Sequence, residues 1–208
     1  MEKEAKVRKS AKKHYSSLPY HNWGHAQTAA KTGAKLADRC EKHGIPLNKM
    51  AVVYALYFHD AGYHEDHTKQ GFDSKEAYSS DIAERELTLL GFPAQFIEKV
   101  RQCITATHKD AKFDTVEEKI VRAADLAGIA GSYKKFAENN EKLRNEFIMR
   151  TGKHVSEKDW IEKSKELLDS YLSEDIKLTP EYYDKKGKSK FHSKARKNVE
   201  RLVKENKR

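Results

Sequence analysis

Apolar residues recur every three or four positions along most of this 208-residue chain, and no segment alternates convincingly with a period of two. The first spacing places apolar side chains on one face of an α-helix, whereas alternation is typical of strands. The clearest case is a stripe of small side chains that includes Ala26, Ala30 and Gly33. The pattern therefore predicts an all-α fold, a single-domain helical bundle over residues 1–208.

Glycine and proline divide this pattern into segments. The segment Leu47–His59 is apolar nearly all round, as expected of a central helix. The polar stretch His64–Asp73 shows no apolar periodicity and is interpreted as a loop, either a disordered connector or a lid. The other expected helices are Lys3–Ser16, His25–His43, Ser74–Leu90, Ala94–His108, a segment from Asp114 or Thr115 to Gly128 or Gly131, and residues 132–150, 156–173 and 190–206.

The net charge of +9 is concentrated at the two ends of the chain. Residues 1–14 carry +4 and residues 185–208 carry +9, which leaves −4 for the body between them. Such ends are usually solvated helix faces or tails, and a basic C-terminal helix or tail is expected from about residue 185. The alternative is association with a polyanion such as nucleic acid, which would depend strongly on salt. No nucleic-acid-binding motif supports that alternative.

Other features bear on the location of the protein. The longest apolar run, Ala51–Phe58, is too short to span a bilayer, so no membrane partner is expected. The first ten residues alternate charges, without the apolar stretch of a secretory signal. Cys40 and Cys103 each fall within an expected helix, as two buried thiols in a reducing compartment would. These features predict a cytoplasmic protein.

Four residues, spread over half of the chain, form a candidate metal site. His25 follows Gly24 and opens a helix, while His59 and Asp60 end the most apolar helix just before Gly62. Asp125 lies among alanines and leucine, where a carboxylate is costly unless a cation pairs with it. Imidazole and carboxylate groups together are the ligands of hydrolytic divalent metals. The alternative is that Asp125 caps a helix or pairs with an arginine.

Three of the following four segments contain these residues: Tyr20–His25, Phe58–Tyr63, Thr105–His108 and Ala124–Leu126. In this order the four segments resemble the successive signatures of the HD-domain metal-dependent phosphohydrolases. They most resemble a group of small, stand-alone predicted phosphohydrolases in that superfamily, and the similarity extends to the C-terminal segments Leu178–Pro180 and Phe191–Asn198. Glu76 and Ser79 match the Glu-x-x-Ser element of this group, although Lys75 stands where asparagine is usual.

The resemblance implies a helical fold of the HD-domain type in which His25, His59, Asp60 and Asp125 bind a divalent metal. Mn, Mg, Fe, Ni and Zn are the candidate ions. It also implies hydrolysis of a phosphate ester or anhydride, by a phosphomonoesterase or phosphodiesterase activity. A phosphorylated small molecule, most simply a nucleotide, is the expected partner.

Glu76 and His108 are the candidate catalytic residues for proton transfer, and His108 could also bind a second metal or contact phosphate. The alternatives are a solvated glutamate in the first turn of a helix, and a helix-terminal histidine stabilised by the helix dipole. Other residues near the motifs are assigned with alternatives. His64 and His67 are either extra metal ligands or exposed loop histidines, and Lys109 and Arg122 are either phosphate contacts or solvated charges. His21 and Asn22 either shape the turn before His25 or hydrogen-bond a ligand. Tyr20, Trp23 and Tyr63 either stack on a nucleobase or pack in the core and pocket wall.

The chain lacks a Gly-x-Ser-x-Gly elbow and a Gly-x-x-x-x-Gly-Lys loop. Catalysis by a serine nucleophile and phosphate binding by a glycine-rich loop are therefore disfavoured. The sequence predicts a metal-dependent phosphohydrolase. The alternatives are a non-catalytic nucleotide-binding module, and a nucleic-acid-associated protein that uses its basic termini.

Overall fold

The computed structural model describes residues 2–173 and 176–206, and within them it is all-helical, with one isolated β-bridge between Tyr183 and Ser189. The predicted fold class is thus confirmed. The chain groups into two compact units, residues 1–125 and 126–208. The single domain inferred from the sequence remains a prediction.

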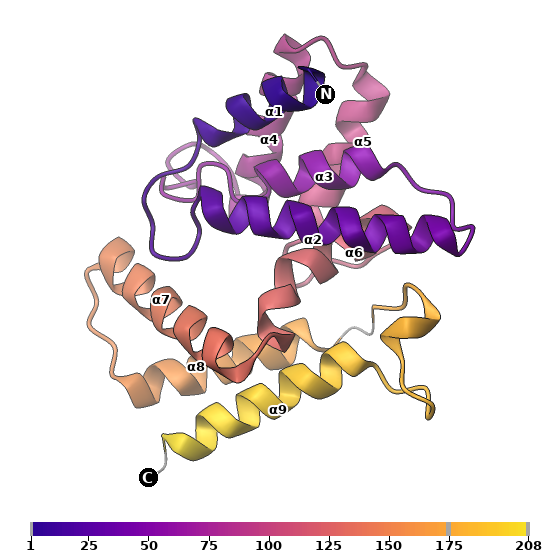
Figure 1. Ribbon diagram of the computed structural model, residues 1–208. Coiled ribbons are helices and arrows are strands. Elements are labelled where there is room, and N and C mark those ends of the chain that lie inside the picture. The colour runs from indigo at the N-terminus through magenta and orange to yellow at the C-terminus, as the bar shows by residue number, and fades with distance from the viewer. Residues whose placement is uncertain (1, 174–175, 207–208) are drawn as a thin grey trace. The chain divides into compact units, whose positions relative to one another are not determined.

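The first unit contains six α-helices (Figure 1). The helix α3 is central, because it packs against each of the other five. Its residues Val52, Ala55, Leu56 and Phe58 are fully buried, in agreement with its nearly continuous apolar sequence. The helices of this unit are α1 (Glu2–Lys12), α2 (Trp23–Lys42), α3 (Lys49–Phe58), α4 (Lys75–Leu89), α5 (Ala94–Thr105) and α6 (Val116–Asp125).

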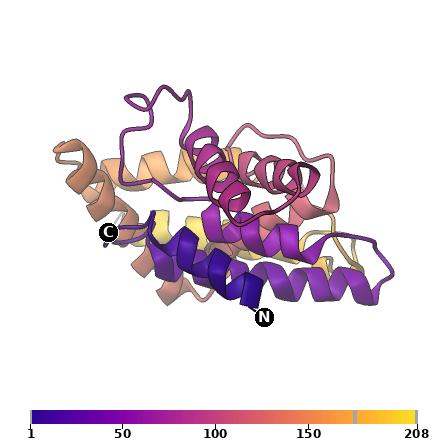
Figure 2. The same cartoon turned by 90° about the horizontal axis from the view of Figure 1, so that it is seen from above.

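The small-residue stripe of α2 explains how closely this helix approaches α3. The two helices run side by side in both views (Figures 1 and 2). A Cβ atom on Gly33 would lie only 2.3 Å from Leu56 Cδ1 and 3.1 Å from Val52 Cγ1. The same position faces α6, since Ala124 Cβ would lie 3.5 Å away. A residue without a side chain therefore lets three helices meet.

Polar side chains fix the helix ends near this core. Asn22 caps α2, because its Oδ1 accepts hydrogen bonds from the amides of Gly24 (2.9 Å) and His25 (3.2 Å). Ser74 caps α4 in the same way through the amide of Ala77. The helix α1 ends at Lys12 rather than Ser16, and the imidazole of His14 then lies 2.7 Å from the Glu86 carboxylate of α4. This interaction explains the early end of α1.

The second unit contains α7 (Tyr133–Thr151), α8 (Glu157–Tyr171), α9 (Lys190–Glu205) and the 3₁₀ turns η1 (Leu126–Ala130) and η2 (Pro180–Tyr182). Asn198 of α9 donates hydrogen bonds to the carbonyls of Ile129 and Gly131, which joins α9 to η1. The basic C-terminal segment is a helix from Lys190 whose lysines and arginines are exposed, while Ala195 and Val199 are buried. Lys207 and Arg208, part of the predicted basic end, lie outside the described residues. None of the described helices has the length and apolar character needed to cross a membrane.

Candidate metal centre

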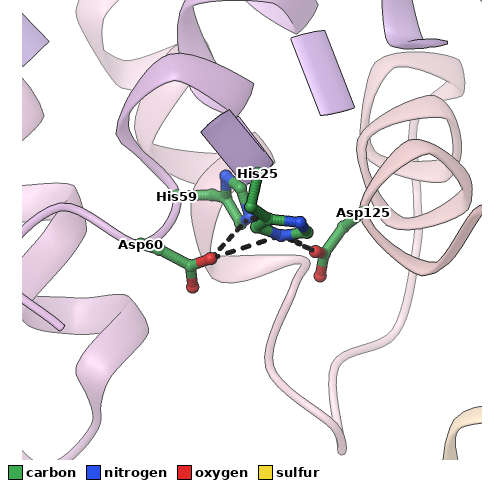
Figure 3. A group of neighbouring side chains, drawn as sticks. All are labelled: His25, His59, Asp60 and Asp125. Carbon is green, nitrogen blue, oxygen red and sulfur yellow. Dashed lines mark hydrogen bonds and ion pairs between the residues drawn. The ribbon is translucent and has the colours of Figure 1, made fainter. Parts of the chain in front are cut away.

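The four residues singled out in the sequence converge in the first unit. His25 comes from the first turn of α2, His59 and Asp60 follow the end of α3, and Asp125 ends α6. Their side chains point toward one another (Figure 3). One ligand atom from each lies within 4.8 Å of all the others, which makes the group able to hold a metal ion.

The spacing of these atoms is that of ligands around one ion. His59 Nε2 lies 2.9 Å from Asp60 Oδ2, 3.2 Å from Asp125 Oδ1 and 3.2 Å from His25 Nε2. His25 Nε2 lies 3.1 Å from Asp125 Oδ1 and 3.5 Å from Asp60 Oδ2. Neighbouring ligands with metal bonds of about 2.1 Å are about 3.0 Å apart in an octahedron and about 3.4 Å apart in a tetrahedron.

The orientation of His59 is fixed by its backbone surroundings. Its Nδ1 lies 2.9 Å from the carbonyl oxygen of Leu56, one turn earlier in α3. A carbonyl oxygen can only accept a hydrogen bond, so Nδ1 must carry the hydrogen and donate it. Nε2 is thereby directed at the cluster, which is how metal-binding histidines are usually held.

Asp60 provides a direct test of whether the residues fit a cation. Its side chain is 2% exposed, and its Oδ2 accepts no hydrogen bond from the described residues, although His59 Nε2 is close. A buried carboxylate oxygen without a hydrogen bond is costly. A divalent cation bound between Asp60, Asp125 and the two imidazoles would satisfy that oxygen, so the donor set fits a metal.

The charges within the cluster are strongly coupled. Burial lowers the pKa of His59, but the carboxylates of Asp60 and Asp125 outweigh it and raise that pKa to about 10. Burial raises the pKa values of both aspartates, and the positive charge of His59 holds them well below their usual range. A proton on His59 and a divalent cation are therefore alternative partners for the same two carboxylates.

Lys75 connects Glu76 to the cluster by contacting both Glu76 and Asp60. Its side chain is buried, and its Oε1 lies 3.1 Å from the Lys75 ammonium, which is itself 3.2 Å from Asp60 Oδ1. Glu76 and His108 line the same cavity, of about 570 Å³, with residues of α4, α5 and the loop before α6. Among the described residues, neither belongs to the group of ligand atoms within 4.8 Å. The structure thus connects Glu76 to the candidate metal centre through Lys75, and connects His108 to Glu76 through the shared cavity.

The motif around Glu76 also supports the loop after Asp60. Ser79 is buried and donates a hydrogen bond of 2.7 Å to the carbonyl oxygen of Ala61. Gly62 has a positive φ of 75°, and a Cβ there would lie 2.6 Å from Tyr78 Cε1. Only glycine fits this turn without a shift of α4. The Glu-x-x-Ser spacing therefore positions the end of α3.

The remaining predicted residues lie in varied positions. Arg122 is buried and donates to the carbonyls of Thr107 and His108, so it stabilises the end of α5 rather than being a solvated charge. Lys109 is exposed and pairs with Asp110. His64 is exposed near Glu65, and His67 is a partly exposed loop residue; neither belongs to the four-residue group found in the described chain.

Aromatic side chains lie around the N-terminal end of α2. The rings of His21 and Tyr63 stack at 3.9 Å, and Tyr20 lies 4.7 Å from the ring of His25. Trp23 packs against Tyr57 and Tyr15. The sequence analysis missed Tyr15, whose pKa is raised by burial and by the charge of Asp60. By sequence, Tyr15 fell within the expected helix Lys3–Ser16 without a motif beside it, whereas in the structure it lies beyond the end of α1.

Comparison with known proteins adds no relative. A scan against models of protein families finds none that matches this chain, and a search of curated proteins finds no match either. The interpretation of the site therefore rests on its geometry and on the residues that form it.

Proposed function

We propose that this protein is a metal-dependent phosphohydrolase and a member of the HD-domain superfamily that it resembles. The observation that carries the proposal is the cluster of His25, His59, Asp60 and Asp125, with ligand atoms 2.9–3.5 Å from His59 or His25 and an unsatisfied oxygen on Asp60. The order and type of these residues along the chain are those of the resemblance. The geometry thus supports a metal site, and the motif order supports its assignment to a phosphohydrolase.

The donor set guides the choice of ion. Two imidazole nitrogens and two carboxylate oxygens are a mixed set, which favours Mn²⁺, Fe²⁺ or another first-row ion over Mg²⁺, because Mg²⁺ prefers oxygen ligands. When bound, a divalent ion at such a site polarises phosphoryl oxygens and activates water for attack on phosphorus. In an octahedral arrangement, four protein ligands would leave two positions for water or a phosphoryl oxygen.

The residues of the neighbouring cavity have separate roles in this proposal. Glu76 is buried beside Lys75, so its carboxylate is held in one place to accept or donate a proton. His108 lines the same cavity, and its Nδ1 accepts a hydrogen bond from the amide of Asp110, which leaves Nε2 for the cavity. A cavity of about 570 Å³ is large enough for a nucleotide-sized ligand.

A phosphorylated small molecule is the proposed substrate, and a nucleotide is the best-supported class. The stacked rings of His21 and Tyr63 lie beside the site, since Lys75 contacts both Asp60 and the face of Tyr63. Aromatic rings next to a metal centre suit a nucleotide, because its base can stack on a ring while its phosphate lies at the metal centre.

The proposal is tested by metal-dependent turnover. The purified protein is assayed with a nucleotide panel and a chromogenic phosphodiester in the presence of Mn²⁺ or Fe²⁺. Asp60→Asn, which keeps the shape but removes the charge, should lower the rate and the metal affinity by at least about 100-fold. The matched control is Asp169→Asn, because Asp169 is an exposed residue of α8 paired with Lys165.

Two results would contradict the proposal. Equal rates for the Asp60 variant and the wild-type protein would show that the cluster does not catalyse the reaction. A tight nucleotide complex without turnover, with any metal supplied, would instead indicate a non-catalytic nucleotide-binding module.

A further inference from the structure

Lys75 occupies an unfavourable position in its helix. It is the first residue of α4, directly after the N-cap Ser74. The N-terminus of a helix carries a partial positive charge, so a cation there is destabilised by the helix dipole. Some other interaction must offset this cost.

Two buried carboxylates provide that interaction. The Lys75 ammonium lies 3.2 Å from Asp60 Oδ1 and 3.1 Å from Glu76 Oε1. It also lies over the ring of Tyr63, 5.1 Å from the centroid. Asp60 and Glu76 are 2% and 5% exposed at their side chains, so each needs a cation nearby. Lys75 supplies one cation to both.

The two oxygens of Asp60 thereby have different partners. Oδ1 faces the Lys75 ammonium, whereas Oδ2 faces the imidazoles of His25 and His59. In hydrolytic centres with two metals, the ions lie about 3.5–4 Å apart, and both act on the reacting oxygens. A carboxylate placed like Asp60 would bridge them. A second ion here would need Asp60 Oδ1 and the Glu76 carboxylate, the two groups that Lys75 already contacts.

We propose that the Lys75 ammonium takes the place of a second divalent ion, so that the protein is a single-metal centre with a built-in lysine cation. This inference rests on the proposed metal-dependent function and specifies how many metal ions the centre holds. The side chain of Lys75 is 29% exposed, so its ammonium is also accessible to an anionic oxygen of the substrate. One metal and one ammonium then share the charge of the phosphate.

The test counts metal ions rather than turnover. Wild-type protein, Lys75→Ala and Lys75→Arg are saturated with Mn²⁺, and the stoichiometry is measured by calorimetric titration and elemental analysis. Electron paramagnetic resonance then distinguishes an isolated Mn²⁺ from a spin-coupled pair. Lys69→Ala is the control, since Lys69 is an exposed residue of the adjoining loop.

One ion per chain is expected for the wild-type protein, Lys75→Arg and Lys69→Ala. Lys75→Ala should bind a second, weaker ion and give a spin-coupled signal, because both carboxylates lose their cation. Lys75→Gln replaces this variant if circular dichroism shows that Lys75→Ala is unfolded, and the same second ion is expected.

The possible failures are distinct. Two ions in the wild-type protein, or only one in folded Lys75→Ala and Lys75→Gln, would overturn the lysine assignment and leave the proposed function standing. Failure of the wild-type protein to bind any Mn²⁺ would overturn the metal site and both proposals with it.

Discussion

His59 joins the helical core to the candidate metal centre. Its Nδ1 is fixed by the Leu56 carbonyl, and its Nε2 is within 3.2 Å of ligand atoms from three other residues. The imidazole is therefore unable to turn away without losing a buried hydrogen bond. Lys75 fixes Asp60 on the opposite side through Oδ1. These two contacts hold the adjacent ligands in place.

Metal binding should depend on pH because of His59. Burial lowers its pKa, but the carboxylates of Asp60 and Asp125 raise the pKa to about 10, so the imidazole is protonated at neutral pH until a metal displaces the proton. Below that pKa, the apparent affinity for Mn²⁺ should rise about tenfold for each pH unit. Calorimetry between pH 6 and 8 in buffers of different ionisation enthalpy measures both affinity and proton release. An affinity that is constant over this range, with no proton released, would contradict the prediction.

At the scale of the helices, the site depends on the junction of α2, α3 and α6. Each helix contributes at least one ligand at or just beyond an end, where side chains can converge because the helical path stops. Gly33 lies at this junction, with Leu56 and Val52 of α3 on one side and Ala124 of α6 on the other. Packing at Gly33 therefore sets the separation of the ligands.

Gly33→Ala should destabilise the protein despite the higher helix propensity of alanine. The new Cβ would lie 2.3 Å from Leu56 Cδ1, so the fully buried Leu56 side chain would have to shift within the core. Overpacking of this kind costs about 1–3 kcal/mol, against a gain of about 1 kcal/mol in propensity. The free energy of unfolding in urea should fall, and the affinity for Mn²⁺ should weaken as the helices separate.

Lys35→Ala is the control for this substitution, since Lys35 is exposed on the same helix. Its effect should stay within about 0.5 kcal/mol. A Gly33→Ala protein as stable as wild type, with unchanged metal affinity, would show that the junction tolerates a wider spacing.

At the scale of the whole molecule, all four ligands and the Glu76 cavity belong to the first of the two compact units. The second unit contains α7–α9 and much of the positive charge, on the exposed face of α9. Residues 126–208 carry 21 lysines and arginines against 14 acidic residues, a net +7 of the chain's +9. The candidate chemistry thus lies in one unit and most of the net positive charge in the other.

Metal binding should stabilise the first unit selectively. Mn²⁺ at 100 times its dissociation constant adds about 2.7 kcal/mol to the stability of the structure that binds it. Hydrogen exchange followed by mass spectrometry should therefore slow in α2, α3 and α6 when Mn²⁺ is added, and the effect should disappear with a chelator. Exchange in α7–α9 should change little. Equal protection of both units would show that they unfold as one.

The sequence by itself determined the helical class and the residues that meet. The three-to-four spacing gave the helices to within a few residues, and the glycines and caps marked most of their ends. His25, His59 and Asp60 were indicated by their places at helix ends beside glycines, Asp125 by its apolar surroundings, and all four by the resemblance of their segments to the HD-domain signatures. Where a contact with a residue far along the chain accompanies the end of a helix, as His14 with Glu86 after α1, periodicity alone could not give the boundary.

The tertiary structure decided what these residues contact. Lys75 looked like a departure from a motif, and only the return of the chain from residue 60 to residue 75 placed its ammonium between Asp60 and Glu76. Arg122 was equally a phosphate contact or a solvated charge by sequence, and only the fold placed its guanidinium against the carbonyls of Thr107 and His108, just after α5. Contacts between residues far apart in sequence depend on the packing of whole helices, whereas periodicity reports only which face of each helix is buried.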